Sequence, residues 1–85
     1  MEQGDETPLA EAAELARRHL ASAESHDRRA ERHEKNAALM EGDGDLLDAR
    51  MLRRHAADER AAARAERERA AAYSKLVQSD PEALD

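Results

Sequence analysis

A five-residue break, EGDGD at positions 41–45, divides a chain that otherwise consists of strong helix formers. Ala, Glu, Arg and Leu dominate on both sides of the break, and Thr7 and Val77 are the only β-branched residues. Glycine ends helices and permits reversals, because it adopts backbone angles that other residues avoid. Two long helices joined by a short turn predict an all-α fold, an antiparallel helical hairpin.

The expected boundaries follow from helix-end signals. Residues 1–6 are predicted to form a disordered lead, and residues 80–85 a short tail. Thr7 before Pro8 is typical of an N-cap followed by proline at the first helical position, so a first helix is expected over 7–41. The turn takes 42–45 and supplies a glycine to end that helix. Asp45 is then the N-cap of a second helix over 46–78, with Asp48 in the capping-box position.

Large apolar side chains are scarce in this chain. Apolar residues make up 40% of the sequence, but well over half of them are Ala, and there is no Ile, Phe or Trp. A lone domain of 85 residues is already marginal in the apolar area that it can bury. Because there is no cysteine, disulfides cannot supply the missing stability. The composition therefore favours a partner chain or a bound metal.

A heptad pattern follows both helices and predicts coiled-coil-like packing. With the turn centred near residue 43, Leu9 is expected opposite Val77 and Ala30 opposite Ala56. The same register places Asp27 opposite Glu59. The predicted seam comprises, in the first helix, Leu9, Ala13, Ala16, Leu20, Ala23, Asp27, Ala30, Glu34 and Ala37, and in the second, Ala49, Leu52, Ala56, Glu59, Ala63, Glu66, Ala70, Tyr73 and Val77.

Several large apolar residues fall beside this seam, where a hairpin alone leaves them exposed. They collect around the turn and at the open end of the hairpin. Packing against a second hairpin buries them, so a homodimeric four-helix bundle is the expected assembly. The predicted interface comprises Leu9, Leu15, Leu20, Leu39, Met40, Leu47, Met51, Leu52, Tyr73, Leu76 and Val77.

One group of side chains in this register has the composition of a metal site. Asp27 and Glu31 share a face of the first helix, and His55 and Glu59 share a face of the second. Four such ligands suit Fe(II), Mn(II) or Zn(II). The competing interpretation is that neighbouring arginines neutralise the carboxylates. The architecture resembles that of the ferritin-like di-iron families, but their Glu-x-x-His signature is absent, so the resemblance assigns no membership.

His19, His26 and His33 recur every seven residues along one side of the first helix. Successive histidines at that spacing are about 10 Å apart along the helix, too far to share one ion within a chain. Such a row is able to bind metal between chains or to form a pH-sensitive contact. A solvated flank is the favoured interpretation.

The remaining patterns bear on function mainly by what they disfavour. A stripe of Arg53, Arg60, Arg64 and Arg67 offers local nucleic-acid contact, but the net charge of −6 and the interleaved carboxylates oppose it. Serines lack the strained turn of a nucleophile, so no catalytic residue is assigned. Lacking a membrane-span pattern, the chain is expected in the cytoplasm. The sequence predicts an acidic interaction protein, either a homo-oligomer or an accessory subunit, with metal binding as the alternative.

Overall fold

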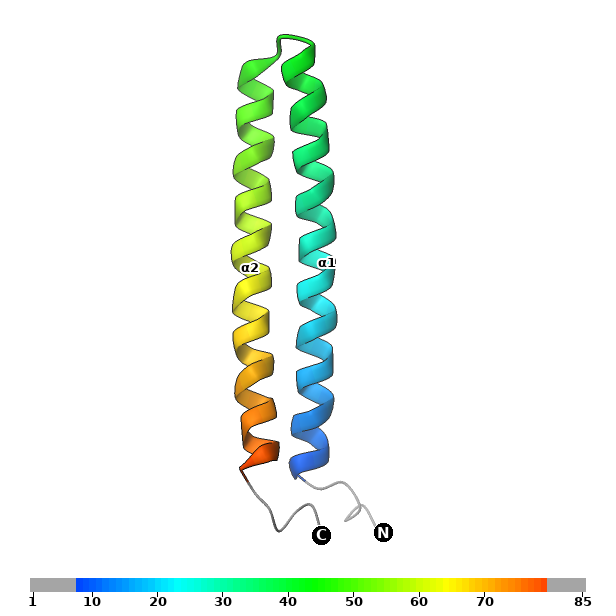
Figure 1. Ribbon diagram of the computed structural model, residues 1–85, viewed down its shortest axis with the longest axis vertical. Helices are drawn as coiled ribbons and strands as arrows, with labels where there is room; N and C mark the ends of the chain where they lie inside the picture. Colours follow the sequence, from blue (N-terminus) through cyan, green and yellow to red (C-terminus); the bar gives the residue numbers. More distant parts are fainter. Residues whose placement is uncertain (1–7, 80–85) are drawn as a thin grey trace.

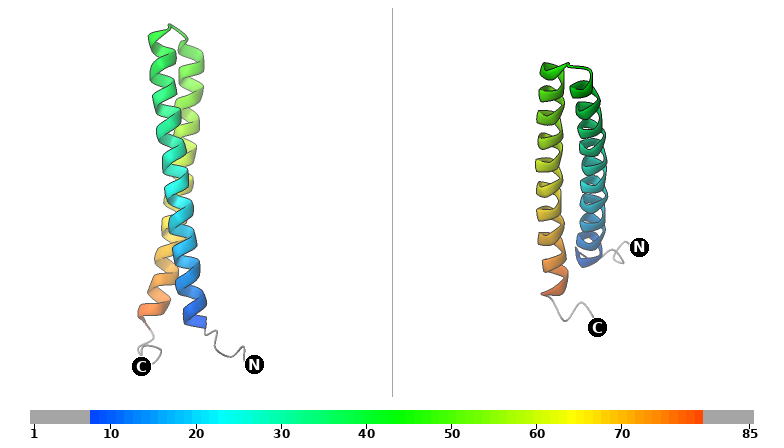
Figure 2. Two further views of the ribbon diagram at one scale, coloured as in Figure 1. Left: turned by 90° about the vertical axis from the view of Figure 1, so that its right-hand side faces the viewer. Right: turned by 45° about the horizontal axis from the view of Figure 1, so that its top comes forward.

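The computed structural model describes residues 8–79, which form two long antiparallel helices (Figure 1). Helix α1 spans Pro8–Gly42 and α2 spans Leu46–Gln78. They lie side by side over their whole length and cross at a shallow angle in the side view (Figure 2). The predicted helical hairpin is confirmed, and the predicted N-cap at Thr7 lies outside the described residues. Neither helix has the length and apolar character that a membrane crossing requires.

The turn is a Schellman motif built on Gly44. The Asp45 N–H donates to the Met40 carbonyl at 2.8 Å, and the Gly44 N–H donates to the Glu41 carbonyl at 3.0 Å. Gly44 has a φ of +82°, in the left-handed region that favours glycine. Gly42 remains within α1. The prediction of a capping box at the other side of the turn is wrong, because the Asp45 side chain makes no capping hydrogen bond.

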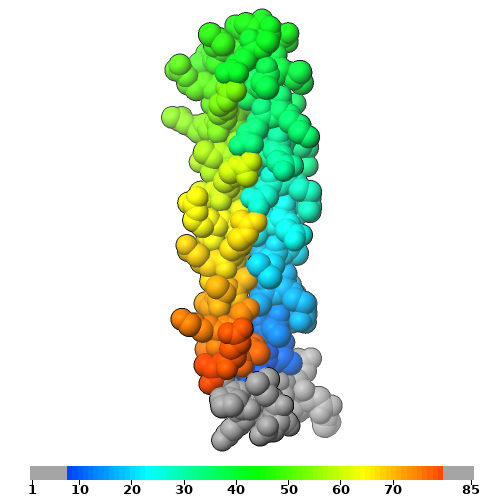
Figure 3. Space-filling view, in the orientation of Figure 1, coloured from blue at the N-terminus to red at the C-terminus, as the bar shows by residue number. Residues whose placement is uncertain are grey.

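The core of the hairpin is a line of alanines. Within residues 8–79 every buried residue is Ala, and the buried set repeats almost perfectly every seven residues in both helices. A methyl side chain fills little space, so the two backbones approach closely and the helices pack tightly in the space-filling view (Figure 3). The buried residues are Ala12, Ala16, Ala23, Ala30 and Ala37 in α1, and Ala49, Ala56, Ala63 and Ala70 in α2.

Eight of the nine alanines of the predicted seam are thus buried. Ala12 is buried in place of the predicted Ala13, and the charged members of the seam are not buried. Asp27, Glu34, Glu59 and Glu66 lie on the edges of the alanine line, with side chains between 18% and 47% exposed. The reason is geometric: two helices held together by alanine leave no width for a second row of larger groups between them. The predicted placement of these four carboxylates within the buried seam is therefore wrong.

Candidate functional site

Each edge of the alanine line carries its own ladder of contacts between the helices. On one edge, which we call the arginine side, each step moves seven residues forward along α1 and seven back along α2. That stepping is what heptad spacing on two antiparallel helices requires. The arginine side comprises the pairs Asp27–Arg67, Glu34–Arg60 and Glu41–Arg53.

The arginine side consists of forked ion pairs near the surface. Arg60 donates Nε–H to one oxygen of Glu34 at 3.1 Å and Nη2–H to the other at 2.7 Å. Arg53 holds both oxygens of Glu41 at 2.5 and 2.8 Å. The guanidinium hydrogen bonds of Arg60 and Arg53 lower the pKa values of Glu34 and Glu41 below their ordinary value of 4.5. The hydrogen bond from Arg67 likewise lowers the pKa of Asp27, so all three acids of this side stay ionised to a lower pH than they would in water.

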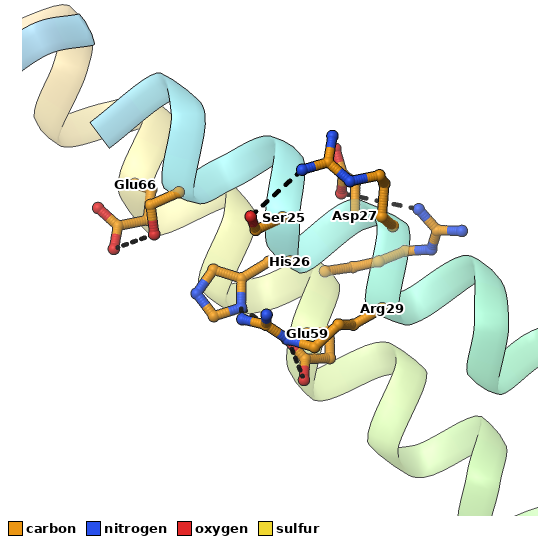
Figure 4. A network of polar contacts seen from close by, with 9 residues as sticks. Ser25, His26, Asp27, Arg29, Glu59 and Glu66 are labelled. Carbon is orange, nitrogen blue, oxygen red and sulfur yellow. Dashed lines mark hydrogen bonds and ion pairs between the residues drawn. The ribbon is translucent and has the colours of Figure 1, made fainter. Parts of the chain in front are cut away.

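The opposite edge, the histidine side, uses histidine from α1 and glutamate from α2. His19 donates its Nδ1–H to Glu66 at 2.5 Å, and His26 donates its Nδ1–H to Glu59 at 2.6 Å. The carboxylate lacks a proton to give, so Nδ1 of each imidazole carries the hydrogen. Ser22 adds a second donor to Glu66 at 3.2 Å. Figure 4 shows His26 meeting Glu59, with Glu66 one step further along the same edge.

The histidine side is less exposed than the arginine side. The side chains of its two histidine–glutamate pairs are 18–25% exposed, against 31–49% for the pairs of the arginine side. The hydrogen bond from His26, with help from the Arg29 charge, lowers the pKa of Glu59, and the bond from His19 lowers that of Glu66. The expectation of a solvated histidine row is therefore wrong for His19 and His26, which join the two helices.

Aromatic rings extend the histidine side in both directions. His19 stacks on Tyr73 with ring centroids 5.7 Å apart and an angle of 7° between the planes. At the turn end His33 meets His55 edge to face, again at 5.7 Å between centroids. Beyond that pair a shallow groove opens between the helices. Its lining is Met40, Asp48, Met51, Leu52 and His55.

The four predicted metal ligands are not brought into one group. Asp27 contacts Arg67 and Arg60 on the arginine side, whereas Glu59 contacts His26 on the histidine side. Figure 4 shows Asp27 apart from the cluster of His26, Arg29 and Glu59. Glu31 is exposed, and the ring of His55 lies against His33. Across residues 8–79 no three His, Cys, Asp or Glu side chains are placed to hold a metal ion.

The predicted interface residues divide into two classes. Six are half-buried within the hairpin itself: Leu9, Leu15, Met40, Leu52, Tyr73 and Val77. Five remain exposed: Leu20, Leu39, Leu47, Met51 and Leu76. Leu46, which belongs to the predicted apolar cluster around the turn but not to the predicted interface residues, joins the exposed set at 65%.

No protein-family model matches this chain, and neither a curated protein nor a solved structure shows significant similarity to it. Functional inference therefore rests on the geometry of the hairpin.

Proposed function

We propose that this hairpin is a helix–helix association module that pairs with a second copy of itself to form a four-helix bundle. One observation carries the proposal: the described residues bury nothing larger than alanine and leave six large aliphatic side chains exposed. A large aliphatic side chain contributes about 1.5–3 kcal/mol when it leaves water completely. Burial of these exposed side chains against a second chain would therefore add stability that the hairpin alone does not have.

The exposed groups are concentrated at the ends of the rod. Leu39, Leu46, Leu47 and Met51 surround the turn, at exposures of 51–69%, and Leu20 and Leu76 lie toward the open end. Between the ends, the flanks carry the charged ladders, whose members already pair across the helices. A second copy of the chain has its exposed apolar residues at the same distances along the rod, and its charged residues between them are already paired. Dimers with two-fold symmetry are the commonest homo-oligomers.

The proposal is tested by mass in solution. Sedimentation of the wild-type chain at tens of micromolar should give a dimer, and the Leu39→Gln, Leu47→Gln double variant should give a monomer of unchanged helicity. Both leucines point away from the alanine line, so their loss leaves the hairpin intact. The matched control is Ala57→Gln, Ala61→Gln, which places glutamine on exposed positions without removing large apolar groups. A monomeric wild type, or a dimeric double variant, overturns the proposal.

The two other functions raised by the sequence gain no supporting contact. The four candidate oxygen and nitrogen ligands have separate partners, as described above. Of the arginine stripe, Arg53, Arg60 and Arg67 are engaged by carboxylates of α1, which offset the charge that a phosphate backbone needs. Self-association is therefore the function that the geometry supports best.

A further inference from the structure

The groove at the turn end of the histidine side contains donors of a kind that the ligand set predicted from the sequence did not include. Met40 of α1 and Met51 of α2 line the same groove as His55. Thioether sulfur is a soft ligand that selects Cu(I), and imidazole also binds copper. We propose that Met40, Met51 and His55 form a binding site for a soft monovalent metal, Cu(I) or its analogue Ag(I).

The two helices direct these donors toward one another. Helical side chains lean toward the N-terminus of their own helix. Met40 therefore leans back along α1 toward His33, and His55 leans along α2 toward Met51, one turn away. The methionine side chain is long and flexible, so its sulfur adapts to a position set by the more rigid imidazole.

A second contact fixes the imidazole. His33 meets the ring of His55 edge to face at 5.7 Å between centroids, so His55 is held at the wall of the groove from across the helix pair. Asp48 also lines the groove, and its negative charge favours a cation there. With two thioethers against a single carboxylate, the donor set favours Cu(I) over Zn(II) or Mg(II).

Metal binding at this site joins α1 to α2. Any ligand that binds the folded hairpin but not the unfolded chain raises its melting temperature. Because Met40 comes from one helix and Met51 and His55 from the other, the full donor set exists only in the folded hairpin, so Cu(I) should raise its melting temperature. Met51 belongs both to the exposed apolar set at the turn and to this groove, so the test below replaces the methionines with leucine, which keeps their apolar surface.

The test is an anaerobic titration of the whole chain with Cu(I) against a chromophoric Cu(I) chelator, with thermal melts in parallel. We expect one Cu(I) per chain and a higher melting temperature. The Met40→Leu, Met51→Leu variant lacks both soft ligands, so it should fail to compete with the chelator and should show little or no thermal shift at the same Cu(I) concentration. Leucine keeps the volume and apolar character of methionine, so the fold and any dimer persist. His19→Gln, a histidine change remote from the groove, is the control and should bind normally.

X-ray absorption of the Cu(I)-loaded chain should show sulfur and nitrogen neighbours. Three outcomes overturn the site: failure of the wild type to compete with the chelator, equal binding by the double-leucine variant, or a preference for Zn(II) over Cu(I). Because the leucine pair preserves apolar surface, an unchanged mass with lost Cu(I) binding separates this site from the proposed dimer interface.

Discussion

The arginine side and the histidine side both join α1 to α2 through carboxylates, the first with arginine partners and the second with histidine partners. Both are heptad ladders on the edges of one alanine line, and both hold carboxylates whose pKa values lie below their ordinary values. The arginine side keeps its acids on α1 and its bases on α2, and the histidine side reverses that order. Because the polarity changes between the edges, neither helix can be rotated about its axis without placing like charges together.

The two sides also differ in what else they support. Guanidinium groups are permanently charged and grip carboxylates in a fork, so the arginine side acts as a fixed set of electrostatic contacts. The histidine side is less exposed, includes stacked rings and ends in the methionine-lined groove. Ligand chemistry is therefore concentrated on one edge of the hairpin. The following predictions test this division, from the largest expected effect to the smallest.

A larger side chain in the alanine line should separate the two helices and weaken the contacts of the arginine side and of the histidine side together. Ala30 is fully buried, so Ala30→Leu forces the helices apart, and overpacking of this kind typically costs about 1–3 kcal/mol. The melting temperature should fall by roughly 5–20 °C. As a control, Ala61→Leu places the same side chain on an exposed position and should change little.

The separation of the helices can be measured directly, because the chain has no cysteine. Spin labels at Glu11→Cys and Lys75→Cys report the distance between the helices toward the open end. This distance should lengthen in Ala30→Leu and stay unchanged in Ala61→Leu. Equal distances in both variants would show that the alanine line does not set the helix spacing.

Acid should weaken both sides together. Asp27, Glu34, Glu41, Glu59 and Glu66 all have pKa values lowered in the folded state, from ordinary values of 3.8 for Asp and 4.5 for Glu. A carboxyl with a lowered pKa stabilises the fold fully above its unfolded value, and that contribution is lost as pH falls through the folded value. Thermal melts should therefore show a decrease beginning near pH 4.5 and continuing below it. Carboxyl titrations by NMR that gave ordinary pKa values would contradict this.

Reversing one charge should affect the arginine side alone. Arg60→Glu places a carboxylate against Glu34 and near Asp27, so the melting temperature should fall, by less than in Ala30→Leu. Adding Glu34→Arg restores an opposite pair and should recover part of the loss. The Nδ1–H resonance of His26 serves as a reporter of the other edge and should not move. Failure of the double variant to recover would indicate that the pair is not a direct contact.

The smallest expected effect is a change in one carboxyl pKa, caused by replacing the single histidine His26. In His26→Gln the donor whose hydrogen bond most lowers the pKa of Glu59 is replaced by a neutral amide, so that pKa should rise toward 4.5. The pKa of Glu34, on the arginine side, should stay where it is. Carboxyl carbon shifts followed through a pH titration measure both in one experiment. A parallel change in Glu34 would show that the two edges are coupled.

Much of this fold is local in origin and could be predicted. The glycines at 42 and 44 and the seven-residue repeat of alanine are properties of short stretches, and they were enough to predict the hairpin and all of its buried alanines except Ala12. The charged contacts were harder to predict. Asp27 was expected opposite Glu59, yet each belongs to a different edge. A rotation of a few tens of degrees about the helix axis, which heptad spacing alone does not fix, decides between the edges.

The contacts along each edge follow a spacing that is visible in the sequence. His19 and His26 are seven apart, as are Glu66 and Glu59 in the reverse direction. Matching complementary residues stepwise along two antiparallel helices would have found this ladder and its arginine counterpart. The search for a four-ligand metal site did not find it, because neighbours in sequence such as His26 and Asp27 point to opposite edges of the helix.

What the sequence by itself determined is the architecture: two helices, one turn and an alanine line, because backbone propensity and apolar period are set residue by residue. Only the tertiary structure decided which charges meet, which leucines stay exposed and that Met40, Met51 and His55 share a groove. Those features depend on the rotation and axial offset of one helix against the other. Both quantities are fixed by packing between residues that are far apart in the chain.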